Sequence, residues 1–275
     1  MKRMMLCGLM MMALSGPASA GEPTLFNRVF QPGEELRYKA KWKFIRLGTV
    51  IVRTLRDHNS EDPQDFKVVM QVESNPDLAF LWIREWNESL MDPATLSSKR
   101  FRGKHRNGDS YVDIRQSYDR QRRTAVYTES DGNTGTIVSS DTLNNVDSYV
   151  EGPSLFFYTR CISHSIGVKR VPTLVKGRIA ATELSFGGDY EEVEIGAVDH
   201  PVRTRRYQGH AEWTGGSSAG VTGEFTGWIS DDEAAVPIAA EMKVLIGSIR
   251  LELEQWIRPG WSPPAGRGVT VVDGK

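Results

Sequence analysis

The chain has 275 residues, of which 39% are hydrophobic and 25% are charged, with 34 lysines and arginines against 35 aspartates and glutamates. This balance excludes a chain built to neutralise nucleic acid, and it excludes an acidic disordered tail. The length suits one large β domain or two small ones. No apolar run beyond the N-terminal segment approaches the roughly 18 residues of a membrane span, so we expect none.

The N-terminal segment has the features of a secretory signal peptide. Lys2 and Arg3 supply a positive start, residues 4–14 are mostly apolar, and Ala18-Ser19-Ala20 is a small-residue cleavage signal. We therefore expect cleavage after Ala20 and a periplasmic or secreted protein. Since Cys7 lies within this segment, Cys161 is the only cysteine of the exported chain and no intramolecular disulfide is expected.

Short β segments separated by turn residues dominate the rest of the chain. Alternating apolar and polar residues predict strands, in chain order, over 38–53, 67–73, 88–91, a hairpin within 96–127, a further strand over 124–128, and then 179–186, 191–195, 201–213, 222–230, 236–244 and 248–257. Asn107-Gly108 predicts a tight hairpin turn within the fourth of these regions. One or two helical turns are expected within 75–86, and a long surface loop over 129–147.

The best candidate for a helix is Pro153–Ser165, which begins with a proline and is followed by Gly167 as a stop signal. About ten strands and one main helix predict a mainly β (α+β) fold, in which a strongly curved antiparallel sheet or half-open β-barrel packs on the helix. We expect one β-rich domain over residues 21–258 and a disordered Pro/Gly-rich tail over 259–275. A half-closed barrel is a common way to form an apolar cavity.

Three segments carry a resemblance to a bacterial protein family. They are Phe30-Gln31-Pro32-Gly33-Glu34 with Leu36, Tyr38, Trp42, Ile45 and Gly48 after it; Ser154 to Arg160 (SLFFYTR); and Trp228-Ile229-Ser230-Asp231-Asp232 followed by Val236-Pro237. Together they resemble the bacterial domain-of-unknown-function 3108 family (DUF3108), from Phe30 to Ile257. The resemblance implies a periplasmic β-rich protein with no assigned reaction. At the level of architecture alone, the pattern is also similar to periplasmic lipoprotein carriers, which enclose an acyl-binding cavity.

Several patterns are reminiscent of catalytic sites, but each has a better structural explanation. Gly216–Gly220 matches G-x-S-x-G, yet strands are expected on both sides of it where a nucleophile elbow needs a helix. Asp231–Glu233 is expected to be a solvated turn and not a calcium loop. Cys161 and His164 share one flank of the expected helix, where a buried thiol explains the cysteine better than a nucleophile does. The histidines lack zinc-ligand spacing, so we expect no enzyme, metal or cofactor.

Two groups of residues are candidates for ligand binding. The apolar group would form a wall, or else belong to a filled core: Phe80, Trp82, Trp86, Phe156 and Phe157. The basic group occupies alternate positions of one expected strand and would share one face: Arg100, Arg102, Lys104 and Arg106. These cations would contact anionic headgroups, unless Asp109, Asp113 and Asp119 neutralise them in an ordinary solvated face.

The sequence therefore predicts a non-enzymatic periplasmic protein that binds an apolar or amphipathic envelope component, such as a lipid or a lipoprotein-like ligand. The expected partners are anionic lipid, lipopolysaccharide or an envelope protein, with no nucleic acid. Two alternatives stay open. One is an envelope-assembly scaffold without a small ligand, and the other is a hydrolase of cell-wall or polysaccharide substrates, which would need convergent carboxylates or a nucleophile–base pair.

Overall fold

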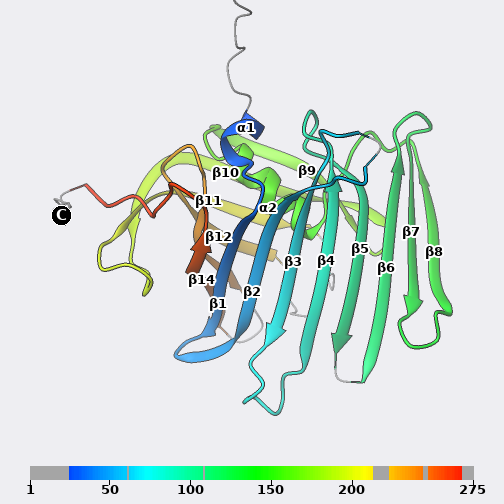
Figure 1. Cartoon of the computed structure of the whole chain (residues 1–275), viewed down its shortest axis with the longest axis horizontal. Helices are drawn as coiled ribbons and strands as arrows, with labels where there is room; N and C mark the ends of the chain where they lie inside the picture. Colours follow the sequence, from blue (N-terminus) through cyan, green and yellow to red (C-terminus); the bar gives the residue numbers. More distant parts are fainter. Residues whose placement is uncertain (1–24, 61, 108, 213–222, 244–246, 268–275) are drawn as a thin grey trace, which may run out of the picture.

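One antiparallel sheet of 14 strands makes up most of the computed structural model, which describes residues 25–60, 62–107, 109–212, 223–243 and 247–267 (Figure 1). Half of the sheet is a meander of consecutive strands: β1 (Glu34–Trp42), β2 (Ile45–Arg56), β3 (Phe66–Ser74), β4 (Ile83–Met91), β5 (Ser98–Asn107), β6 (Ser110–Asp119), β7 (Thr124–Asp131) and β8 (Ile137–Asn144). The other half is a second meander: β9 (Gly167–Val175), β10 (Arg178–Val193), β11 (Val202–Ala211), β12 (Gly223–Ser230), β13 (Pro237–Lys243) and β14 (Ser248–Ile257). Pairing of β14 with β1 joins the two halves.

The sheet curls until its two edge strands, β8 and β9, lie close together. A methyl group added at Gly177, in the turn after β9, would lie 2.5 Å from a carboxylate oxygen of Asp141 on β8. The segment before the main helix bridges this seam, because Val150 pairs with Thr173 of β9 and the Tyr149 carbonyl accepts a hydrogen bond from the Ser98 amide. The result is a half-closed barrel with a concave inner face.

Both helices, α1 (Leu25–Val29) and α2 (Gly152–Cys161), lie at the same end of this barrel (Figure 1). Phe157 of α2 is fully buried, with its ring centroid 4.7 Å from that of Phe66 on β3 and 6.1 Å from that of Phe26 on α1. Aliphatic side chains of β1, β2, β13 and β14 complete this core. The helices therefore close one end of the barrel with a packed apolar plug. No helix among the described residues is long and apolar enough to cross a membrane.

The mainly β, antiparallel architecture is as expected, but the count of about ten strands is wrong. The largest error is at the two edges, where β8 falls within the expected loop over 129–147 and β9 was not expected at all. On β8, Ile137 and Val138 are 63% and 67% exposed and most other residues are polar, so no apolar alternation marks the strand. β9 contains Pro172, which lowers the expectation of a strand but is tolerated at an edge.

Three other expectations also need correction. The main helix ends at Cys161 and not at Ser165, and residues 75–82 form turns before β4 instead of a helix. Residues 259–267 of the expected disordered tail pack on the domain: Trp261 Nε1 donates to an Asp232 carboxylate oxygen at 2.8 Å, and the Gly266 amide donates to the Pro201 carbonyl at 2.8 Å. The expected signal peptide, the G-x-S-x-G segment and residues 268–275 lie outside the described residues.

Candidate functional site: a cavity inside the curved sheet

A cavity of about 830 Å³ lies between the concave face of the sheet and the first turns of α2. Small-molecule sites commonly occupy about 300–1,000 Å³. The strands supply alternate residues to its walls, for example Val50 and Val52 of β2 or Met70 and Val72 of β3. The curvature of the sheet thus converts the inward face of a simple meander into an internal compartment.

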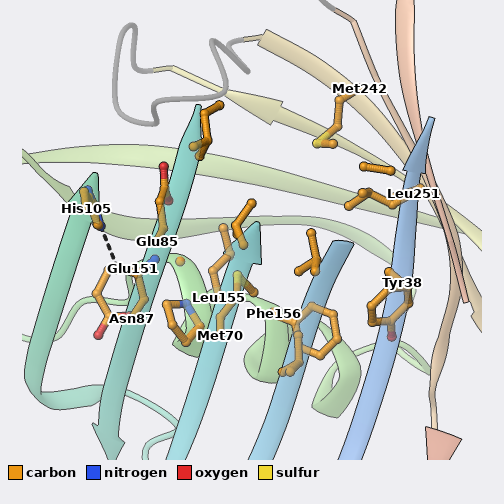
Figure 2. A pocket seen from close by; sticks show the side chains of 18 of the residues that line it. Tyr38, Met70, Glu85, Asn87, His105, Glu151, Leu155, Phe156, Met242 and Leu251 are labelled. Atoms are coloured by element: carbon orange, nitrogen blue, oxygen red, sulfur yellow. Dashed lines mark hydrogen bonds between the residues drawn. The ribbon is translucent and has the colours of Figure 1, made fainter. Parts of the chain in front are cut away.

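One half of the cavity wall is apolar, and it comes from β1–β3, β12–β14 and α2 (Figure 2). The Tyr38 ring packs edge-on against Phe156 at 6.2 Å, and its hydroxyl donates to the Pro237 carbonyl at 3.0 Å. Burial raises the pKa of Tyr38 well above its ordinary value, so the phenol stays neutral. Further apolar side chains surround this pair: Val50, Val52, Met70, Val72, Leu155, Phe225, Met242, Ile249 and Leu251.

Polar side chains gather in the other half, on β4, β5, β6, β7 and the start of α2, where they lie among the apolar Ile83, Phe101, Val112 and Ile114. His105 Nε2 and Asn87 Oδ1 are hydrogen-bonded at 2.7 Å across β4 and β5 (Figure 2). Gly103 makes room for this pair, because an added methyl group would lie 2.9 Å from Asn87 Oδ1 and 3.1 Å from His105 Nε2. The remaining polar members of this wall are Glu85, Gln116, Tyr127, Glu129 and Glu151.

Glu151 lies deep in the cavity, where it caps the N-terminus of α2. Its carboxylate accepts hydrogen bonds from the hydroxyls of Ser89 at 2.9 Å, Ser98 at 2.5 Å and Ser154, and from the Ser154 amide at 3.3 Å. Burial raises the pKa of Glu151, although these hydrogen bonds oppose the change. The site therefore holds a carboxyl group at its base that is more easily protonated than an exposed glutamate.

Aromatic residues surround the end of the barrel opposite α2. Glu73 and Ser110, which are exposed and line the cavity, lie at this end, and so do the β1–β2 turn and the β3–β4 loop (Figure 1). Phe44, Phe80 and Trp82 in these connections are 89%, 76% and 58% exposed. Leu81 and Ile83 beside them contribute to the cavity wall. The cavity therefore meets solvent beside a rim of exposed aromatic rings.

The structure separates the residues expected to form one ligand site. Phe156 lines the cavity, whereas Phe157 points into the core and Phe80 and Trp82 lie at the rim. Trp86 alternates with the inward-facing Glu85 and Asn87, so it lies on the convex face. The four cations lie there as well, because Phe101, Gly103 and His105 take the inward positions of β5: Arg100, Arg102, Lys104 and Arg106. The sheet itself stands between these cations and the cavity.

On the convex face, the four cations have mixed surroundings. Arg102 lies opposite Arg115 of β6, which concentrates positive charge, but Lys104 lies opposite Asp113. Arg106 stacks over the Tyr111 ring at 5.1 Å, and Arg100 Nη2 lies 4.0 Å from an Asp57 carboxylate oxygen. We call Arg100, Arg102, Lys104 and Arg106 the convex basic patch.

Sequence reasoning missed the polar wall. Glu85 and Asn87 alternate with Trp86 and Glu88, so both faces of β4 carry polar residues and the alternation gives no indication of which face is inside. Once the curl of the sheet is known, polar residues at inward positions of a strand, such as Glu85 and Asn87, identify the polar wall of the cavity.

The residues considered for catalysis lie elsewhere. Among the described residues that line the cavity, none is Cys161, His164 or Asp231. Burial raises the pKa of Cys161 to about 12, so the thiol stays protonated, and His164 is exposed beside the Asp232 carbonyl. Asp231 pairs with Arg203 and Arg205. No group of three or more metal-ligating side chains occurs within the described part of the chain.

Two solved structures show what the fold is similar to. A β-barrel-like protein of the domain-of-unknown-function DUF1849 from Brucella abortus is 9% identical, with a TM-score of 0.55 over 81% of this chain and 96% of that chain. A DUF1089 family protein from Pseudomonas aeruginosa is 11% identical, with a TM-score of 0.37 over 72% of this chain and 90% of that chain. The first supports the β-barrel-like fold and says nothing of function.

No curated protein matches this chain. The family model described as protein of unknown function (DUF3108) matches residues 37–254, which include the three segments of the resemblance except for Phe30–Leu36. The half-closed barrel, the helix plug and the cavity all lie within or directly beside this range. The chain therefore belongs to the DUF3108 family, whose function is unknown.

Proposed function

We propose that this is an exported, non-enzymatic protein that binds an apolar or amphipathic component of the cell envelope inside its barrel. The observation that carries the proposal is the cavity of about 830 Å³, which is lined mostly by apolar residues and has a group of polar side chains on one side. Sites for amphiphiles need both surfaces, since the chain must leave water while the polar end keeps its hydrogen bonds.

The apolar half offers enough driving force for such a ligand. Each buried methylene contributes about 0.8 kcal/mol, so ten of them contribute about 8 kcal/mol. This is comparable with the roughly 4–15 kcal/mol of freedom lost on association. Phe80 and Trp82 of the rim would contact the chain as it enters, and Phe156 would contact it inside.

The convex basic patch has a separate role in this proposal. Because the sheet separates it from the cavity, it contacts anionic headgroups of a membrane surface or lipopolysaccharide and not the enclosed ligand. Export to the periplasm, with removal of residues 1–20, places the protein where such surfaces are available.

A scaffold of envelope assembly is the second candidate. The observation in its favour is edge strand β8, where Ile137 and Val138 are 63% and 67% exposed, so another chain can pair with this edge. In a scaffold the cavity would hold no specific ligand.

A cavity-filling substitution distinguishes the two candidates. Val72 lines the cavity, whereas Val126 is 36% exposed on β7 and is not among the lining residues. We expect the neutral fluorescent probe N-phenylnaphthylamine to bind the wild-type protein and Val126→Trp equally, and Val72→Trp at least tenfold more weakly. Thermal unfolding shows that each variant is folded. Absence of probe binding to the wild type, or equal binding by all three proteins, would favour the scaffold.

A further inference from the structure

The charged side chains that line the cavity are mostly acidic. Four acidic residues and one lysine line the cavity within the described part of the chain: Glu73, Glu85, Glu129, Glu151 and Lys176. Lys176 and Glu73 are exposed, so the enclosed carboxyl groups are those of Glu85, Glu129 and Glu151, of which Glu151 is the most easily protonated. The four cations of β5 all face away from the cavity. The interior therefore has an excess of carboxyl groups.

The enclosed polar wall is also rich in hydrogen-bond acceptors. Gln116 points inward from β6, is 5% exposed, and has no partner for its Oε1 among the described residues. A buried acceptor without a partner is costly, and a ligand that donates a hydrogen bond removes that cost.

The charge and the hydrogen-bonding pattern together identify the class of ligand. We infer that the cavity takes amphiphiles whose polar end is a hydrogen-bond-donating amine and rejects those that end in a carboxylate or phosphate. This inference rests on the proposed ligand-binding function and specifies its ligand. An ammonium group would donate to Gln116 Oε1 at the polar wall, where Glu85 and Glu129 add negative charge, with its alkyl chain along Val50, Met70 and Leu251.

The preference for an amine over a carboxylate follows from electrostatics in an enclosed site. Like charges repel and opposite charges attract more strongly in a low-dielectric interior than in water. A carboxylate ligand in this cavity would face carboxyl groups with no arginine among the described lining residues. His105 also lines the enclosed wall, and its Nε2 is hydrogen-bonded to Asn87 Oδ1.

Three amphiphiles with the same alkyl chain test the inference. Dodecylamine, dodecanol and dodecanoate, each below its micelle concentration and at pH 8, are used to displace N-phenylnaphthylamine from the full exported chain. We expect dodecylamine to bind at least tenfold more tightly than dodecanoate, with dodecanol between them. Equal binding of all three, or tightest binding of dodecanoate, would overturn the inference while leaving the proposed function intact. If the probe binds but none of the three displaces it, the inference also fails.

Matched variants show whether the polar wall is responsible. Glu85→Gln should reduce the preference for dodecylamine over dodecanoate at least fivefold while leaving dodecanol binding unchanged. Glu129→Gln serves as a second inward variant if Glu85→Gln does not fold. The control is Glu88→Gln, on the same strand but facing outward, 3.6 Å from Lys67. An equal effect of Glu88→Gln and Glu85→Gln would contradict a role for the polar wall.

Discussion

Arg160 of α2 forms a fully buried, two-pronged ion pair with Glu34 of β1. Its Nη1 and Nη2 donate to the two carboxylate oxygens at 2.5 and 3.0 Å, and Arg258 donates to the same carboxylate from beyond β14. The Arg160 guanidinium also donates to the carbonyls of Ala234 and Ala235, both at 3.0 Å. Glu34 and Arg160 belong to two of the three segments that carry the family resemblance, and the alanines lie between the two parts of the third. This interaction fixes the helix plug to the centre of the sheet.

Breaking this ion pair should destabilise the protein strongly. Arg160→Met leaves the buried Glu34 carboxylate with Arg258 alone, and Glu34→Gln leaves the buried Arg160 and Arg258 without their carboxylate. Removing one partner of a buried ion pair costs about 3–5 kcal/mol. Denaturant unfolding measures the loss, and a double-mutant cycle isolates the interaction between the two residues. The control is Glu224→Gln, which removes the exposed pair with Lys243 and should leave the unfolding midpoint unchanged.

Acid should destabilise the fold through two carboxylates. Burial alone raises the pKa of Glu34, but Arg160 and Arg258 outweigh it and the pKa is lowered. Burial likewise opposes ionisation of Glu252, yet the Gly196 amide, Lys39 and Lys41 lower its pKa from 4.5 to about 2. A carboxyl group with a lowered folded-state pKa contributes stability that is present above pH 4.5 and is lost as the pH falls towards 2.

Glu252→Gln tests this pH dependence. The variant should be less stable than the wild type near neutral pH by roughly 2–3 kcal/mol, and the difference should shrink as the pH falls below about 4. Urea unfolding between pH 7 and pH 2 measures both. If the difference in unfolding free energy between the variant and the wild type is constant over this range, the ion pairs of Glu252 with Lys39 and Lys41 do not account for that difference.

Glu151 should have the opposite pH dependence. Burial raises its folded-state pKa, so the stability that it contributes is present in acid and is lost as the pH rises through that pKa. Glu151→Gln cannot ionise, and its stability relative to the wild type should therefore improve from pH 4 to pH 8. A relative stability that falls over this range would show that the ionised carboxylate is the favoured form at the cap of α2.

The sequence determines the architecture more clearly than the site. Strands β1 and β14 alternate apolar and polar residues because their two faces differ in burial, and such short β segments predict a curved antiparallel sheet with a helix on it. The edges were missed because β8 has little apolar surface to bury and β9 contains a proline. The tail was expected to be disordered, but Trp261 packs 5.7 Å from Trp256 and orders the first part of it.

The candidate site could be predicted only in part. A half-closed barrel predicts a cavity, and Phe156 is one of the residues that line it. The inward or outward direction of Glu85 and Trp86 depends on register, since neighbouring positions of a strand point to opposite faces. The same register decides whether the cations of β5 face a ligand or solvent. The local sequence of one strand does not show which face is inside.

The convex basic patch should bind anionic membranes independently of the cavity. Changing Arg100, Arg102, Lys104 and Arg106 together to glutamine should weaken binding to vesicles that contain phosphatidylglycerol, and it should leave N-phenylnaphthylamine binding unchanged. Val72→Trp should leave vesicle binding unchanged and weaken N-phenylnaphthylamine binding. Vesicle co-sedimentation at low and high salt measures the first effect, because screening weakens surface electrostatics. Unchanged vesicle binding by the fourfold variant would exclude the patch as a membrane contact.

The central claim is that the cavity holds an amphipathic ligand, and the native mass of the protein tests it most directly. The protein is purified from the periplasm without detergent, its mass is measured under native conditions, and any bound molecule is extracted and identified. We expect a stoichiometric adduct of lipid mass, lost in Val72→Trp and retained in Val126→Trp. A bare protein mass, unchanged after incubation with envelope lipids, would contradict the claim.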